Sequence, residues 1–169
     1  MAATNNKAEY AASAAATITL ASLASSSTLV AGRSSAEIDN STNKYLDDWI
    51  GGKITGGTTP TANTAIEVWV IPKKSDSAYH DTFDGTDKAV TVTTREMLRA
   101  YGKLLAVIEV IATTSNVGYE FSASVADAVR TLLPAKYQLF VVHNCGAALN
   151  ATGGNHVIDR KGLYSTSGG

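Results

Sequence analysis

Turn-forming residues cut this chain into short segments rich in β-branched and aromatic side chains, which restricts it to folds built from many short strands. Glycine-rich clusters such as residues 56–60 separate the segments. The clearest segment is 65–71. Its alternation places Ile66, Val68 and Val70 on one face, as expected for a strand with at least one side in a core.

Two other long segments, 104–112 and 137–143, also predict strands. Segment 104–112 is apolar on both faces apart from Glu109, which is typical of a strand covered on each side. A buried helix is the alternative, but its β-branched residues and the turn cluster that follows favour a strand. The remaining expected strands are 17–23, 29–38, 52–55, 90–93, 119–122 and 156–164.

Only two short helices are expected. One covers 94–102 with Thr94 as its N-cap, and the other covers 124–133 with Ser124 as its N-cap. Many strands, few helices and glycine-rich turns predict an all-β protein, a two-sheet β-sandwich for which a jelly roll is the favoured topology.

The chain of 169 residues fits one domain, which we place at residues 14–169. Residues 1–13 are rich in Ala and Asn and lack the β-type pattern. We therefore expect an N-terminal arm that is flexible or becomes ordered on a partner.

Charge is scarce and balanced. The chain has 14 Lys and Arg against 15 Asp and Glu, and charged residues make up 17% of it, compared with roughly a quarter in ordinary soluble domains. Without a one-signed patch, nucleic acid and membranes are poor candidate partners. A surface rich in Ser and Thr suits permanent contact with other subunits. A single cysteine excludes an internal disulfide and fits synthesis in a reducing cytoplasm.

No catalytic residue is expected. His143 and Cys145 are residue types that a hydrolase could use as base and nucleophile. Side chains two apart at a strand end are not assured of hydrogen-bonding distance, and no nucleophile signature surrounds Cys145. A strand-end histidine followed by turn residues is the favoured interpretation, and a hydrolase remains an alternative.

No metal or cofactor is expected either. Residues 76–87 concentrate oxygen-bearing side chains that could suggest calcium, but they lack the spacing and closing Glu of an EF-hand loop. Turn formation explains them better. Trp49, Trp69 and Tyr79 could form a sugar-binding surface, which leaves a carbohydrate-binding surface module as an alternative function.

Residues 31–47, AGRSSAEIDNSTNKYLD, resemble a family of small virion structural proteins of tailed bacteriophages. The further matching blocks are 59–64, 66–70, 140–144, 148–153 and Asn155-His156. Together the blocks span most of the chain beyond the arm. The family continues with Thr-Gly after its His-Asn pair, whereas here Cys145 precedes Gly146.

The resemblance implies a structural role on the virion without catalysis. The preferred hypothesis is a head decoration, or cement, protein on the capsid surface that contacts the major capsid protein and copies of itself, as a homotrimer. A tail or connector component is the alternative. The candidate subunit contacts are Lys7, Glu9 and Tyr10 in the arm and Tyr79, His80, Asp81, Phe83 and Asp84 in a loop expected to be mobile. An arm of this kind could add a strand to a neighbour's sheet.

Overall fold

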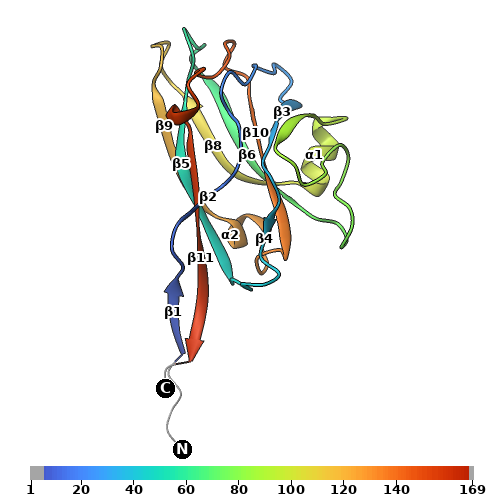
Figure 1. Ribbon diagram of the computed structural model, residues 1–169. Coiled ribbons are helices and arrows are strands. Elements are labelled where there is room, and N and C mark those ends of the chain that lie inside the picture. The colour runs from blue at the N-terminus through green and yellow to red at the C-terminus, as the bar shows by residue number, and fades with distance from the viewer. Residues whose placement is uncertain (1–5, 168–169) are drawn as a thin grey trace, which may run out of the picture.

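Two antiparallel sheets face each other in the computed structural model, which describes residues 6–167 (Figure 1). The first sheet has the order β1-β11-β5-β9, with the short β2 also on β11, and the second has the order β7-β3-β10-β6-β8, with β4 on β10. The first sheet consists of β1 Asn6–Tyr10, β2 Ala14–Ala15, β5 Asp47–Thr55, β9 Gly118–Ser124 and β11 Val157–Ser167. The second consists of β3 Ala31–Ser34, β4 Ile38–Asp39, β6 Thr64–Pro72, β7 Lys88–Thr91, β8 Lys103–Val110 and β10 Lys136–His143. The expected all-β two-sheet sandwich is confirmed.

The strand pairs are nested along the chain. β1 and β2 pair with β11, β3 with β10, β5 with β9, and β6 with β8, all antiparallel. The chain also changes sheet between β5 and β6, between β8 and β9, and at each later connection. Strands that are far apart in sequence therefore lie side by side. The loops that join β2 to β3, β5 to β6, β8 to β9 and β10 to β11 meet at one end of the sandwich (Figure 1).

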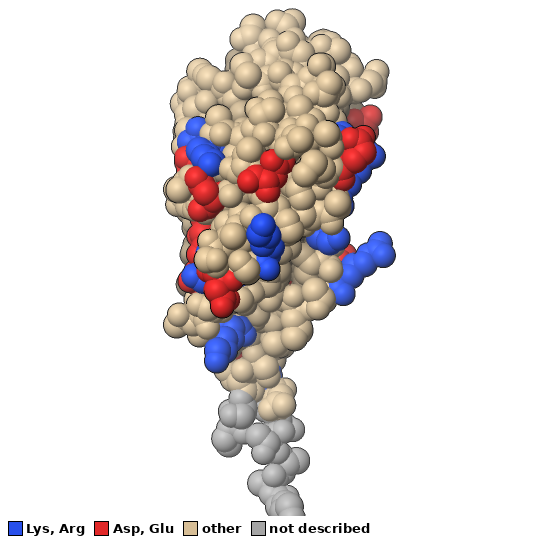
Figure 2. Space-filling model, turned by 90° about the vertical axis from the view of Figure 1, so that its right-hand side faces the viewer, with Lys and Arg blue, Asp and Glu red and all other residues tan. Residues whose placement is uncertain are grey.

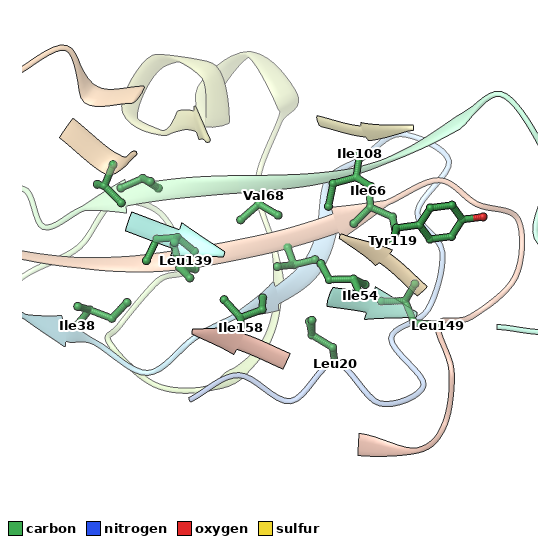
Figure 3. Close-up of a cluster of buried hydrophobic side chains, with 14 of the residues drawn as sticks. Leu20, Ile38, Ile54, Ile66, Val68, Ile108, Tyr119, Leu139, Leu149 and Ile158 are labelled. Carbon is green, nitrogen blue, oxygen red and sulfur yellow. The ribbon is translucent and has the colours of Figure 1, made fainter. Parts of the chain in front are cut away.

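The main core fills the space between the sheets. Figure 3 shows side chains from both sheets pointing toward one another, among them Val68 and Leu139 from the second sheet and Ile54 and Ile158 from the first. Leu20, from the segment that joins β2 to β3, closes one side of this cluster. Burial of these apolar side chains is the main favourable contribution to the fold.

A second hydrophobic cluster lies on the outer face of the second sheet. The face formed by Trp69, Ile71, Phe140 and Val142 is covered by α1 Arg95–Tyr101 and by the connection between β6 and β7. β6 and β10 are consequently buried on both faces, as the near-complete burial of their residues shows. The predicted core face of 65–71 is confirmed, and its opposite face is covered as well.

One prediction about burial is wrong. Segment 104–112 forms strand β8 as expected, but β8 lies at the edge of its sheet and is not covered on both sides. Val107 is 57% exposed, and Ile111, just beyond the strand, is 72% exposed. The hydrophobicity of the segment does not distinguish a covered strand from an edge strand whose outer face meets solvent.

The weaker predicted elements have mixed outcomes. Segment 17–23 contains no strand, and segment 29–38 is divided between β3 and β4. Thr94 and Ser124 cap α1 and α2 Val125–Val129, accepting hydrogen bonds from Met97 N and Asp127 N. α2 is shorter than expected because Arg130 adopts a left-handed conformation with φ of 56°. A short 3₁₀ helix, η1 Gly153–Asn155, precedes β11.

The N-terminal segment is partly a strand. Residues 6–10 form β1, whose main chain pairs with residues 163–167 of β11. Residues 1–5 of the predicted arm lie outside the described part of the chain. The predicted arm is flexible or becomes ordered on a partner, whereas residues 6–10 are ordered on β11 of the same chain. A main-chain ladder requires no particular side-chain pattern, so the residues of this strand carry no sign of it. The segment still extends beyond the sandwich, as a ribbon with β11 (Figure 1).

Candidate assembly interface

In the described part of the chain, the four loops at one end of the sandwich contain no Lys, Arg, Asp or Glu. Segments 17–32, 54–66, 110–119 and 137–158 contain no Lys, Arg, Asp or Glu. Their loops, 21–28, 56–63, 111–117 and 144–152, meet at the end of the molecule opposite the ribbon, which we call the loop end. Figure 2 shows that the upper part of one face, which belongs to this end, carries no charged side chains. The low content of charged residues in the whole chain is thus due in part to these uncharged loops.

Hydrogen bonds hold these loops against one another. Asn116 N donates to Gly57 O at 3.1 Å, and Asn150 Nδ2 donates to Asn116 Oδ1 at 2.6 Å. Ser22 N donates to Asn150 O at 3.1 Å, and Thr61 N donates to Cys145 O at 2.8 Å. All four loops take part in these or neighbouring bonds, so the loop end is a preformed surface.

Glycine is required where two of these loops touch. A Cβ atom on Gly57 would lie 1.9 Å from the carbonyl oxygen of Ala148, far inside van der Waals contact. A hollow of about 360 Å³ opens beside this contact and is lined by Ser22, Thr58, Asn116 and residues 147–152. Among the described residues that line it there is no aromatic or charged side chain, so the hollow offers hydrogen-bonding groups and small apolar groups only.

The opposite end carries the ribbon of β1 and the end of β11. Beyond Leu163 the pairing of β11 with β5 ends, and within the described residues β11 continues there with β1 as its one strand partner. All five residues of β1 are exposed, including the predicted contacts Lys7, Glu9 and Tyr10. Glu9 accepts hydrogen bonds from Tyr164 Oη and Thr166 Oγ1, each at 3.3 Å. The three predicted arm contacts are therefore accessible to a partner.

The predicted contact loop has a different environment. Tyr79 and Phe83 are buried in the second hydrophobic cluster. The prediction that their side chains contact another subunit is therefore corrected, because they belong to the core. The loop is also anchored to the sheet. Tyr79 Oη donates to Glu37 Oε2 at 3.0 Å, and Gly85 N donates to Gln138 Oε1 at 2.9 Å. The expected mobility is not supported by these contacts, because they attach the loop at several points.

The three remaining predicted contacts, His80, Asp81 and Asp84, lie at the surface of the loop. Both aspartates already accept hydrogen bonds from residues of the same chain. His80 stacks on Tyr101 with ring centroids 5.0 Å apart. Asp81 accepts hydrogen bonds from Thr93 N and Oγ1, at 2.8 and 2.9 Å. Hydrogen bonds from Lys88 and Thr86 lower the pKa of Asp84 to about 2. Within residues 6–167, no three His, Cys, Asp or Glu side chains gather as metal ligands.

His143 and Cys145 do not form a nucleophile and base pair. Both are almost fully buried. His143 Nε2 lies 3.0 Å from Leu23 O, and Nδ1 accepts a bond from Cys145 N at 3.4 Å, so the ring faces main-chain groups and not the thiol. Burial lowers the pKa of His143 and raises the pKa of Cys145, which favours the neutral form of each.

The aromatic residues considered for sugar binding are separated. Trp49 is 46% exposed on β5 of the first sheet, whereas Trp69 and Tyr79 are buried under α1 and the loop on the second sheet. The structure therefore does not bring them together as one platform.

No family model, curated protein or solved structure matches this chain. In the described range, none of the helices has the length and apolar character needed to span a membrane.

Residue-level prediction missed the loop end, although a signal for it is visible in the sequence. The four charge-free segments are separated along the chain, and each is unremarkable alone. A search for charge-free segments at the turns would have found them, but only the nested strand pairing shows that they share one end.

Proposed function

We propose that this chain is a structural, non-enzymatic subunit of a tailed-phage particle, a decoration protein that is made in the bacterial cytoplasm and stabilises the head from the capsid surface. The observation that carries the proposal is the loop end, a preformed surface without charge. Burying such a surface against another protein desolvates no ion, so the cost that limits charged interfaces is avoided. A freely diffusing protein gains nothing comparable from an end without charge.

The topology supports the finer assignment of a jelly roll. In that topology one long antiparallel ribbon is rolled up, so that the first strand pairs with the last and the inner pairs nest within them. The pairs β1/β2–β11, β3–β10, β5–β9 and β6–β8 follow this scheme, and β7 adds one strand beside β3. Jelly rolls are common among viral capsid proteins, and fold alone does not define function.

In this proposal the loop end binds the major capsid protein, and many copies on one particle multiply contacts that are individually weak. The trimeric state expected from the resemblance remains part of the proposal. A tail or connector protein is the alternative within the same class, and it would form a ring of few copies instead of covering the head.

Two measurements test the proposal. Quantitative mass spectrometry of purified particles should find hundreds of copies, while a ring would supply about a dozen. Second, lysine substitutions at exposed loop-end positions, Thr58→Lys and Ala151→Lys, should reduce binding to heads that lack the protein. Ser77→Lys is the matched control, because Ser77 is exposed beside charged residues near the other end.

The results separate the possibilities. Absence of the protein from purified particles would refute the phage role altogether. If both loop-end lysine variants bind heads as well as the Ser77→Lys variant does, the loop end is not the capsid-binding surface. Loss of binding in the loop-end variants with unchanged stability would support the proposed contact.

A further inference from the structure

The ribbon at the end opposite the loop end has little support beyond the contact between Tyr164 and Tyr45. A two-stranded antiparallel ribbon with no hydrophobic face is marginally stable in water. Here every residue of β1 is exposed, and among residues 6–167 the part of β11 beyond Leu163 has no strand partner other than β1. Among the described strands β1 is also the last of its sheet, so its outer edge has no strand partner within residues 6–167.

The orientation of these main-chain groups follows from one hydrogen bond. Ala11 N donates to Gly162 O at 2.8 Å, so Ala11 and Gly162 are a hydrogen-bonded pair. Such pairs alternate along an antiparallel ladder, which assigns Lys7 and Glu9 to bonds with β11. The N–H and C=O groups of Asn6, Ala8 and Tyr10 therefore point to the free edge.

The sequence of β1, NKAEY, is complementary to itself when two copies run antiparallel. With Ala8 opposite Ala8 of the second copy, all five residues overlap, and the outward groups of Asn6 meet those of Tyr10. Lys7 then lies opposite Glu9 of the other copy, twice in each dimer, at the kind of position where cross-strand side chains come closest. A register shifted by two residues loses overlap and brings the two Lys7 side chains or the two Glu9 side chains opposite each other.

We propose that two copies of this chain join through the free edges of β1, with a twofold axis at Ala8, to make a continuous sheet across both molecules. The occupant of the edge is thus a second copy. This inference goes beyond the proposed function, because it depends on β1 alone and holds for the protein with or without a phage particle. A twofold contact adds to any threefold contact between copies, since it uses a surface at the ribbon.

Cysteine crosslinking tests the register directly. Opposed hydrogen-bonded residues have Cα atoms about 5.5 Å apart, which suits a disulfide. Ala8→Cys in the full chain should therefore give a covalent dimer under mild oxidation. Asn6→Cys is the control, because two Asn6 residues would be about 14 Å apart in this register, too far for a disulfide. Cys145 is buried and should contribute no crosslink.

Main-chain and charge variants test the mechanism, with self-association followed by sedimentation over a range of concentrations. Ala8→Pro removes the outward N–H without removing a bond to β11, and should abolish dimers, whereas Ala8→Ser should retain them. Lys7→Glu places like charges opposite each other and should raise the dimer dissociation constant about tenfold. The double variant Lys7→Glu with Glu9→Lys should restore association.

Several results would overturn the proposal. One is equal crosslinking of the Ala8→Cys and Asn6→Cys variants, and another is the same weakening in the double charge variant as in Lys7→Glu. The native protein could stay monomeric at all concentrations while the Ala8→Pro variant attaches to particles less well than the native protein does. That result would show that β1 pairs with a different protein. These outcomes are independent of the loop-end variants, so failure here leaves the proposed function to its own test.

Discussion

Tyr137 donates a 2.6 Å hydrogen bond to Asp48 Oδ2 and so joins the two sheets through the main core, because Tyr137 lies on β10 and Asp48 on β5. Both side chains are fully buried. Arg160 Nη1 donates to the same carboxylate oxygen at 2.9 Å. Burial raises the pKa of Tyr137, so the phenol stays protonated as the donor. The pair is a specific polar connection between the two sheets.

Replacing Tyr137 by Phe should destabilise the protein by about 1–3 kcal/mol, because a buried carboxylate loses a hydrogen bond and no solvent can replace it. Chemical denaturation measures this free energy of unfolding. Tyr164→Phe is the matched control, since Tyr164 donates a longer bond of 3.3 Å to exposed Glu9 and should change stability by less than about 0.5 kcal/mol. Equal effects of the two substitutions would contradict the role of the inter-sheet bond.

The cover on the second sheet depends on α1. Leu98 is its one buried residue and belongs to the second hydrophobic cluster. Leu98→Ala should cost about 2–5 kcal/mol in unfolding free energy, because it leaves a cavity against the sheet. Met97→Ala, at a position 44% exposed, should cost less than about 0.5 kcal/mol. A small loss for Leu98→Ala would mean that α1 is held mainly by its flanking connections.

Contact between loops at the loop end can be tested by two glycine substitutions. Gly57→Ala should lower stability by about 1–3 kcal/mol, since its Cβ would collide with Ala148 O. Gly153→Ala should have little effect, because nothing lies within 4 Å of a Cβ there. Thermal unfolding compares the two. An unperturbed Gly57→Ala variant would show that the two loops separate easily.

Stability should fall with mild acid because of His143. Its folded-state pKa is lowered by burial from 6.5, so between these two pKa values the unfolded chain binds more protons than the folded one. The contribution of the neutral ring is present above about pH 6.5 and is lost progressively as the pH falls below that value. Protonation would also place a proton on Nδ1 facing the N–H of Cys145.

Unfolding free energies measured between pH 7.5 and pH 5 should therefore decrease in the native protein by more than in a His143→Gln variant. The two proteins are compared by the slope of unfolding free energy against pH, since the variant is itself less stable than the native protein. Parallel pH profiles for the two proteins would rule out His143 as the source of the pH dependence.

The class of fold and most of the strands are readable from the amino-acid sequence. Alternation in 65–71 and 137–143 identified β6 and β10, because side chains two residues apart share a face and one such face of each segment is apolar. The caps Thr94 and Ser124 placed the starts of α1 and α2, since capping is a local interaction. Local interactions of this kind are readable without knowledge of the neighbours.

The positions of strands at sheet edges and the meeting of distant loops depend on how the whole chain packs. Segment 104–112 is as hydrophobic as a central strand, yet β8 is an edge, and this depends on partners elsewhere in the chain. β1 forms through main-chain bonds that leave no pattern in its side chains. Tyr79 and Phe83, predicted as contacts, are buried because distant residues cover them. Pairing between residues far apart in sequence sets these properties, and no local pattern encodes it.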